Sequence, residues 1–188
     1  MLAQALQFLL DTLVQPFAAI LLLRFHLQWL RAPLRNPVGE FVMVFTDFVV
    51  LRTRRFIASA WGYDTATLLL AAIVEGFYVT ANLGVQGYPF TGLPLLGLLA
   101  WTVVKLLKIS IYLLIGSLFV EAILSWVNPH TPLAPVLNAI NRPFLSPLRR
   151  RLPTIGNLDL SVLALFILCQ LILIVPVTWL ERLAVGLL

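Results

Sequence analysis

Residues 160–180 read LSVLALFILCQLILIVPVTWL, and this stretch decides the fold class of the chain. It carries no charged side chain, and it has the length of about 20 residues that a helix needs to cross the hydrocarbon core of a bilayer. Similar apolar runs cover roughly residues 6–30, 65–83 and 100–127. A β-barrel would show alternating segments of about ten residues, whereas these runs are continuous and rich in Leu, Ala and Ile. The sequence therefore predicts an all-α membrane protein with four transmembrane helices.

The composition excludes most other classes of protein. Hydrophobic residues make up 61% of the chain and charged residues 11%, with a mean hydropathy of +0.98, whereas soluble domains are about half apolar and about a quarter charged. A single Cys excludes a disulfide-rich scaffold. The first run carries Asp11 early and has no basic segment before it, so we expect a retained span and not a cleaved signal peptide.

Basic residues mark the expected topology. Of the 13 Lys and Arg residues, 9 lie in two polar segments, 31–63 and 128–158, while the connection 84–99 has no charged residue. By the positive-inside rule, both Arg-rich segments face the cytoplasm and both termini face the outer side. Because most basic side chains are confined to these two segments, we expect contact with anionic lipid headgroups and no nucleic-acid binding.

Each Arg-rich segment contains a stretch that is too apolar for a free loop. Residues 41–56, FVMVFTDFVVLRTRRF, predict a helix that lies in the membrane interface. Residues 132–153 are interrupted by Pro143, Pro147 and Pro153, which predict short helical pieces joined by turns. Lipid contact and topology explain the basic residues, and a docking surface for another membrane protein or a second copy is the functional alternative. The residues expected to make these contacts are Arg54, Arg55, Trp126, Pro143, Pro147, Arg149, Arg150 and Arg151.

The two halves of the chain are similar to each other. RFHLQWL at 24–30 aligns with EAILSWV at 121–127, and the pairs Arg54–Arg55 and Asp64 align with Arg149–Arg150 and Asp159. Because each half holds an even number of spans, the repeats are expected to be parallel. We therefore predict a first repeat, 1–83, a non-cytoplasmic linker, 84–99, and a second repeat, 100–188, each with a basic interfacial hairpin between its spans. Acidic and hydroxyl side chains bind free N–H groups at helix starts, a role that suits Asp64, Asp159 and Ser161.

The alignment also places charged residues of the spans at equivalent depths. Arg24 aligns with Glu121 and Asp11 with Lys108, so each pair has opposite charge. Pairing between the repeats would lower the cost of burying these charges, which on insertion scales is about 2.5 to 3.5 kcal/mol for each one near the bilayer centre. The alternative is that all four side chains reach the interface independently.

A second matched set, Glu75 and Gln170, lies about eleven residues into the second and fourth spans. An acidic residue at this depth suggests a proton or cation site. The alternative is a protonated Glu75 that is hydrogen-bonded to Gln170 and holds two helices together.

No group of residues predicts catalysis or a cofactor. Ser125, Ser146 and Ser161 would need a base, and the candidate base His130 has no evident carboxylate to orient it. His26 is a single histidine on one span, which is weak support for haem ligation, and Cys169 is most simply a small apolar residue. We therefore expect a protein that is not an enzyme and holds no metal or cofactor.

Three motifs in the second half resemble the YggT family, also called YlmG: ILSWVNP at 123–129, NRPFLSPLRRRLP at 141–153 and IGNLDLS at 155–161. The resemblance covers the whole chain as two tandem repeats, and the second repeat matches better. In the family, the helix before the Ser-Trp motif usually carries Arg, whereas this chain has Glu121 there.

The resemblance implies a bacterial inner-membrane protein without an established enzymatic activity. Family members are associated with cytochrome b6 maturation in plastids, with cell division or nucleoid distribution, and with osmotic or potassium-related adaptation. We therefore expect a scaffold or assembly factor for other membrane proteins. The alternative is a component of ion handling or osmotic-stress adaptation.

Overall fold

The computed structural model describes residues 1–57, 63–89, 94–128, 130–152 and 159–188, and in these ranges the chain is helical without a β-strand. Four helical stretches are long and apolar enough to cross a membrane, which confirms the predicted number of spans: Leu2–Trp29, Thr65–Val85, Leu95–Val127 and Leu160–Val185. The elements are α1 (Leu2–Leu9), a short π-helix η1 (Leu10–Val14), α2 (Gln15–Trp29), α3 (Pro37–Thr53), α4 (Thr65–Val85), α5 (Leu95–Val127), α6 (Ala134–Arg149), α7 (Leu160–Ile172), a short π-helix η2 (Leu173–Val177) and α8 (Thr178–Val185).

Proline accounts for the interruptions in the first and fourth spans. Pro16 opens α2 directly after η1, and Pro176 lies inside η2. Because proline has no backbone N–H, it removes one helical hydrogen bond. A short π-helical segment lets the helix continue past the missing bond. Both spans therefore run on as long helices. The fourth continues to Val185, beyond the predicted end at 180, and this extension carries Glu181.

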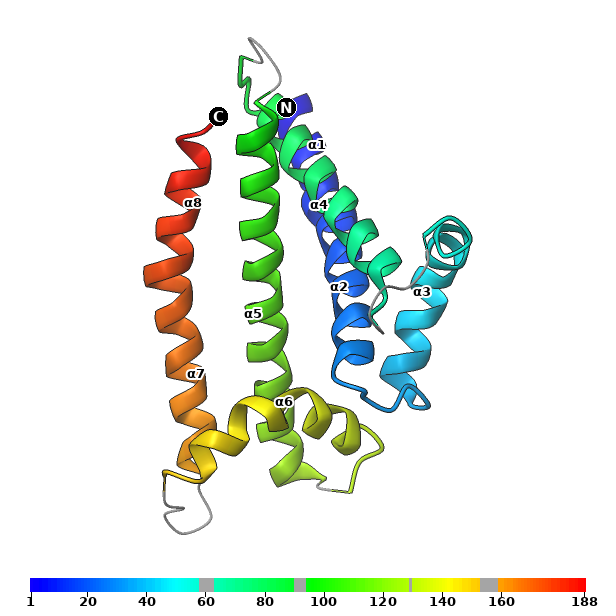
Figure 1. Cartoon of the computed structure of the whole chain (residues 1–188), viewed down its shortest axis with the longest axis vertical. Coiled ribbons are helices and arrows are strands. Elements are labelled where there is room, and N and C mark those ends of the chain that lie inside the picture. Colours follow the sequence, from blue (N-terminus) through cyan, green and yellow to red (C-terminus); the bar gives the residue numbers. More distant parts are fainter. Residues whose placement is uncertain (58–62, 90–93, 129, 153–158) are drawn as a thin grey trace.

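The central element of the fold is α5. In Figure 1, α2 and α4 pack on one side of α5, and α7 and α8 pack on the other. Both termini lie at one end of the molecule, and α6 crosses the opposite end of α5. Within the described residues α4 does not pack against α7. The two halves of the chain therefore meet mainly along α5.

Asn36 sets the start of α3, which stands beside α2 and α4 (Figure 1). The Asn36 side chain accepts hydrogen bonds from the backbone N–H groups of Val38 and Gly39, as an N-cap does. A Cβ atom at Gly39 would collide with the Leu34 carbonyl, so only glycine fits this close approach. One face of α3 is buried, and the other exposes a stripe of large apolar side chains: Phe41, Val44, Phe45, Phe48 and Leu51.

The prediction of short pieces for residues 132–153 is wrong, because α6 is one helix from Ala134 to Arg149 with Pro143 and Pro147 inside it. The face packed on the bundle consists of Val136, Leu137, Ile140, Asn141 and Leu145. Both prolines are exposed, so the carbonyl groups that they leave without an N–H partner lie on the open side of the helix. The continuous buried face offsets the lost hydrogen bonds. Pro153 lies outside the described residues.

Candidate functional site

An Arg–Asp pair joins each Arg-rich segment to the start of the following span. Arg54 binds Asp64 with Nη2 and with Nε, the latter at 3.3 Å from Oδ1. Arg149 Nε lies 2.8 Å from Asp159 Oδ2. Asp159 also accepts a hydrogen bond from the Ser161 backbone N–H, so both Asp64 and Asp159 cap the helices that follow them. The second pair lies 95 positions after the first, as in the alignment of the two halves.

These contacts favour the ionised form of both carboxyl groups. Burial raises the pKa of Asp64, but hydrogen bonds from Arg54 and Thr67 outweigh that effect and hold the pKa below its usual value. The pKa of Asp159 is lowered in the same way, since the hydrogen bonds from Arg149 and Ser161 outweigh its burial. Each span therefore begins at a fixed negative charge that holds an arginine.

A second kind of contact, here called the polar clasp, ties α3 to α2. Arg24 is buried in α2, with 4% of its surface exposed. Its Nη1 donates to Thr46 Oγ1 at 2.6 Å and to Asp47 Oδ1 at 2.7 Å, both on α3. These two bonds offset part of the cost of burying the guanidinium group, although its Nε has no hydrogen-bond partner among the described residues.

The second half has a polar clasp of opposite charge. Asn141, fully buried on α6, donates to the Glu121 carboxylate on α5 and accepts from the Ser117 hydroxyl at 2.6 Å. Asn141 lies 95 positions after Thr46, and Glu121 aligns with Arg24. In each half, then, a buried polar residue of the Arg-rich segment binds a charged residue of the preceding span.

The predicted charge pairs between the halves do not form. Arg24 binds Thr46 and Asp47, and Glu121 binds Asn141. Residues of α3 and α6 thus bind the two charged side chains that the alignment had paired with each other.

Asp11 and Lys108 also have other partners. Asp11 accepts a hydrogen bond of 2.8 Å from the Tyr78 hydroxyl on α4. Lys108 Nζ lies 2.8 and 3.0 Å from the two carboxylate oxygens of Glu181 on α8. The physical reason is the same in both cases, because antiparallel neighbours bring the start of one span beside the end of the next.

Glu75 and Gln170 are likewise not brought together. Glu75 on α4 is fully buried, and neither carboxylate oxygen has a hydrogen-bond partner among the described residues. Gln170 is half-buried on α7, which does not pack against α4 within the described residues. The predicted Glu75–Gln170 hydrogen bond is therefore wrong.

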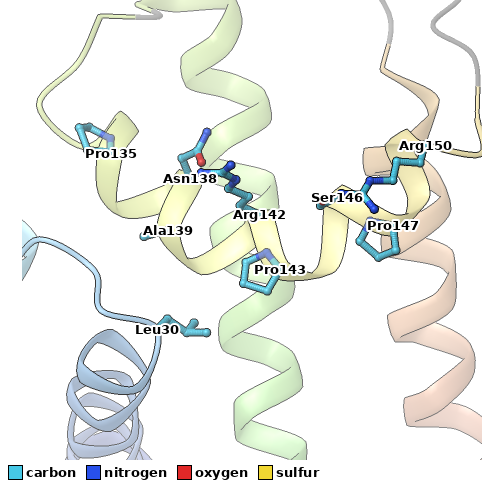
Figure 2. A pocket seen from close by; sticks show the side chains of 9 residues that line it. All are labelled: Leu30, Pro135, Asn138, Ala139, Arg142, Pro143, Ser146, Pro147 and Arg150. Carbon is cyan, nitrogen blue, oxygen red and sulfur yellow. The ribbon is translucent and has the colours of Figure 1, made fainter.

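A polar groove of about 750 Å³ runs along α6. Figure 2 shows its lining residues on one face of α6, together with Leu30 at the end of α2. Arg142 and Arg150 are exposed there and form no ion pair with another described residue. The lining residues are Leu30, Pro135, Asn138, Ala139, Arg142, Pro143, Ser146, Pro147 and Arg150.

The remaining predicted contact residues lie outside this groove. Arg55 and Arg151 are exposed. Trp126 is 82% exposed and lines a mainly apolar groove of about 390 Å³ between α5 and α7. No cluster of three or more His, Cys, Asp or Glu side chains suited to a metal occurs in the described part of the chain.

Sequence reasoning missed Asp47, Asn141 and Glu181 as partners, and Arg142 as a lining residue. The three missed partners each have a signal in the sequence. Asp47 lies in the largely apolar stretch FVMVFTDFVV, and Asn141 follows the apolar pair Ala139–Ile140, so both are polar positions beside apolar ones, where a buried polar partner is expected. Glu181 follows the fourth apolar run by one position, so a modest extension of that helix finds it.

Comparisons with known proteins show the family of the chain. The family model CCB3/YggT matches residues 3–80 and 100–180. Relatives include YggT of Escherichia coli K12, which is 33% identical over 89% of this chain and 86% of its own. A Pseudomonas aeruginosa protein is 34% identical over 88% and 84% of the two chains, and a Vibrio alginolyticus protein 37% identical over 87% and 88%. No solved structure matches the chain. The chain therefore belongs to the CCB3/YggT family, and its four apolar helices make it a membrane protein.

Proposed function

We propose that this protein is a non-enzymatic scaffold or assembly factor for other membrane proteins in the bacterial inner membrane, with the groove of α6 as its docking surface. The observation that carries the proposal is the exposed Arg142 and Arg150 on a helix that is fixed in place. Arginine presents a planar set of donors that suits carboxylate groups of a partner protein.

The contacts that fix α6 in place favour a docking surface over basic residues that serve membrane topology alone. The positive-inside rule requires only that basic residues lie near the membrane, and a loose loop would meet it. Here Asn141 ties the middle of α6 to α5, and Arg149 ties its end to Asp159. Such preorganisation lowers the entropy lost when a partner binds.

We further propose that the chain is built from two parallel repeats. The Arg–Asp pairs at a constant offset, the polar clasps at aligned positions and the two matched segments of the family model all support this division. In this proposal α3 and α6 belong to basic hairpins on the cytoplasmic side, and both termini lie outside. Residues 84–99 then form the connection on the outer side.

A site-specific crosslinking experiment in cells tests the docking surface. A photoreactive amino acid placed at Asn138 or Ser146, both in the groove, is expected to capture one membrane protein reproducibly. The matched control is Phe144, which is exposed on α6 but does not line the groove. The same adduct from Phe144, or lipid and self-adducts alone from the groove positions, would contradict the proposal.

A second candidate function is ion handling or osmotic adaptation, and the unpartnered Glu75 is the observation that favours it. Here the variant Glu75→Ala would lose an osmotic phenotype at unchanged protein level. Under the scaffold proposal the same variant keeps that phenotype, whereas replacement of Arg142 and Arg150 removes it.

A further inference from the structure

Glu75 lies in an apolar layer between α2 and α5. One turn before it on α4, Ala71 packs with Leu21 of α2 and Ile109 of α5. One turn after it, Val79 packs in a second apolar cluster. Glu75 itself is fully buried, and its two carboxylate oxygens have no hydrogen-bond partner among the described residues.

An ionised carboxylate in this setting lacks both water and a donor, which makes it costly. The protonated form carries no charge, so the apolar layer accommodates it. The ionised form requires a cation to come close. Glu75 is therefore suited to bind a proton, and to release it when a nearby cation moves next to the carboxylate.

Lys105 on α5 is placed to supply that cation. A Cβ atom at Gly76, the residue after Glu75, would lie 3.5 Å from Thr102 Oγ1 on α5, and Lys105 lies one turn after Thr102 on the same side of that helix. Lys105 Nζ lies 4.0 Å from Glu181 Oε1 and 5.8 Å from the ring centre of Trp101. Lys108 already binds both oxygens of Glu181, at 2.8 and 3.0 Å. Lys105 is thus the more weakly held of the two cations, and it can leave without depriving Glu181 of a partner.

The other charged or titratable groups on the described elements packed against α4 are either engaged or exposed. On α5, Lys108 binds Glu181 and Glu121 binds Asn141, and on α2 His26 contacts the Leu22 carbonyl oxygen. The exposed ones are Glu40 and Arg52 on α3 and Tyr112 on α5. Asp11 in η1 is bound by the Tyr78 hydroxyl, and Arg24 on α2 is bound to Asp47 on α3. The helix α1 contains no titratable side chain. Among the cations on these described elements, Lys105 is the half-buried one that has only a loose partner.

We propose that Glu75 is a proton-binding site, and that release of its proton is coupled to movement of the Lys105 ammonium from Glu181 to Glu75. The neutral carboxyl gives up a proton to water, the ammonium keeps all of its own protons, and no covalent bond within the protein other than the O–H breaks. The movement exchanges a contact between α5 and α8 for one between α5 and α4. The inference is independent of the role proposed for α6 and gives the second candidate function a chemical basis.

Infrared difference spectroscopy of the full-length protein in lipid nanodiscs tests the site. Titration with pH is expected to show a carboxylic-acid carbonyl band that disappears in the variant Glu75→Gln. In Lys105→Gln the midpoint of this band moves to higher pH by about one unit or more, because the ionised form loses its cation. In Glu181→Gln it moves to lower pH, because Lys105 is released. Arg182→Gln is the matched control, since it removes an exposed positive charge beside Glu181 and should leave the midpoint in place.

Three results would overturn the inference. The first is the absence of a band sensitive to Glu75→Gln at every pH at which the protein stays folded. The second is a midpoint that Lys105→Gln leaves unchanged. The third is a band that sodium or potassium ions remove at constant pH, because the carboxylate would then bind a metal cation. Thermal unfolding of each variant confirms that it is folded, and none of these results bears on the crosslinking from α6.

Discussion

Replacing Asn141 with alanine removes the side chain that ties α6 to α5. Asn141 is fully buried and donates to the Glu121 carboxylate. A hydrogen bond to a charged group contributes about 1.5 to 3 kcal/mol. The Ser117 hydroxyl keeps a partner, because it also lies 2.8 Å from the Leu114 carbonyl oxygen. We therefore expect Asn141→Ala to lower the free energy of unfolding by about 2 to 3 kcal/mol.

The assay is equilibrium unfolding in mixed detergent micelles, followed by loss of helicity. Asn138→Ala is the matched control, because it makes the same chemical change at an exposed position of the same helix. An exposed substitution of this kind changes stability by about 0.5 kcal/mol or less. Equal losses in the two variants would refute the clasp.

A double-mutant cycle isolates the pair itself. Glu121→Leu removes the carboxylate that Asn141 binds, so in this background Asn141→Ala should cost less than in the unmodified protein. We expect an interaction energy of about 1 kcal/mol or more between the two positions. Additive effects would show that Asn141 and Glu121 act independently, and the reasoning would then fail.

Stability should also depend on pH, because hydrogen bonds hold the pKa of Asp64 and Asp159 below the usual value despite burial. This contribution is present above the unfolded-state pKa of about 4 and is lost as pH falls through the lower folded-state pKa. Asp64→Asn and Asp159→Asn should therefore flatten the fall in stability at acid pH, and an unchanged slope would argue against the Arg–Asp pairs. Gly39→Ala should destabilise the protein by more than about 1 kcal/mol, since its Cβ would collide with the Leu34 carbonyl. Gly116→Ala, which meets open space, should be neutral or stabilising in the same equilibrium unfolding assay, and equal behaviour of the two glycine variants would contradict the close approach at Gly39.

Hydropathy alone predicts the four spans, because a bilayer demands about 20 apolar residues for each one. The predicted bounds of a span differ from those of its helix where a charged residue ends the apolar run but not the helix. The extension of the fourth span to Val185 brings Glu181 beside Lys108, and a hydropathy window that stops at residue 180 does not include it. The helix starts at Asp64 and Asp159 are readable from sequence because capping is local.

The sequence marks candidate partners but does not predict which charges pair, because the pairing depends on where α3 and α6 fold back. Alignment of the halves paired Arg24 with Glu121, but each is satisfied by the Arg-rich segment that follows it. Proline content likewise predicted a broken α6. Its buried apolar face, a tertiary property, keeps the helix continuous through Pro143 and Pro147. Local sequence rules thus predict the helices, whereas tertiary packing determines which polar residues of the candidate site contact each other.

Co-purification with charge variants tests the proposed docking surface most directly. Arg142→Gln together with Arg150→Gln removes both exposed arginines of the groove, whereas Arg151→Gln removes an exposed arginine outside it. At matched abundance in cells, quantitative mass spectrometry should show a stoichiometric membrane-protein partner with the unmodified protein and with Arg151→Gln, and its loss from the double variant. Retention of every partner at the unmodified level by the double variant would contradict the account.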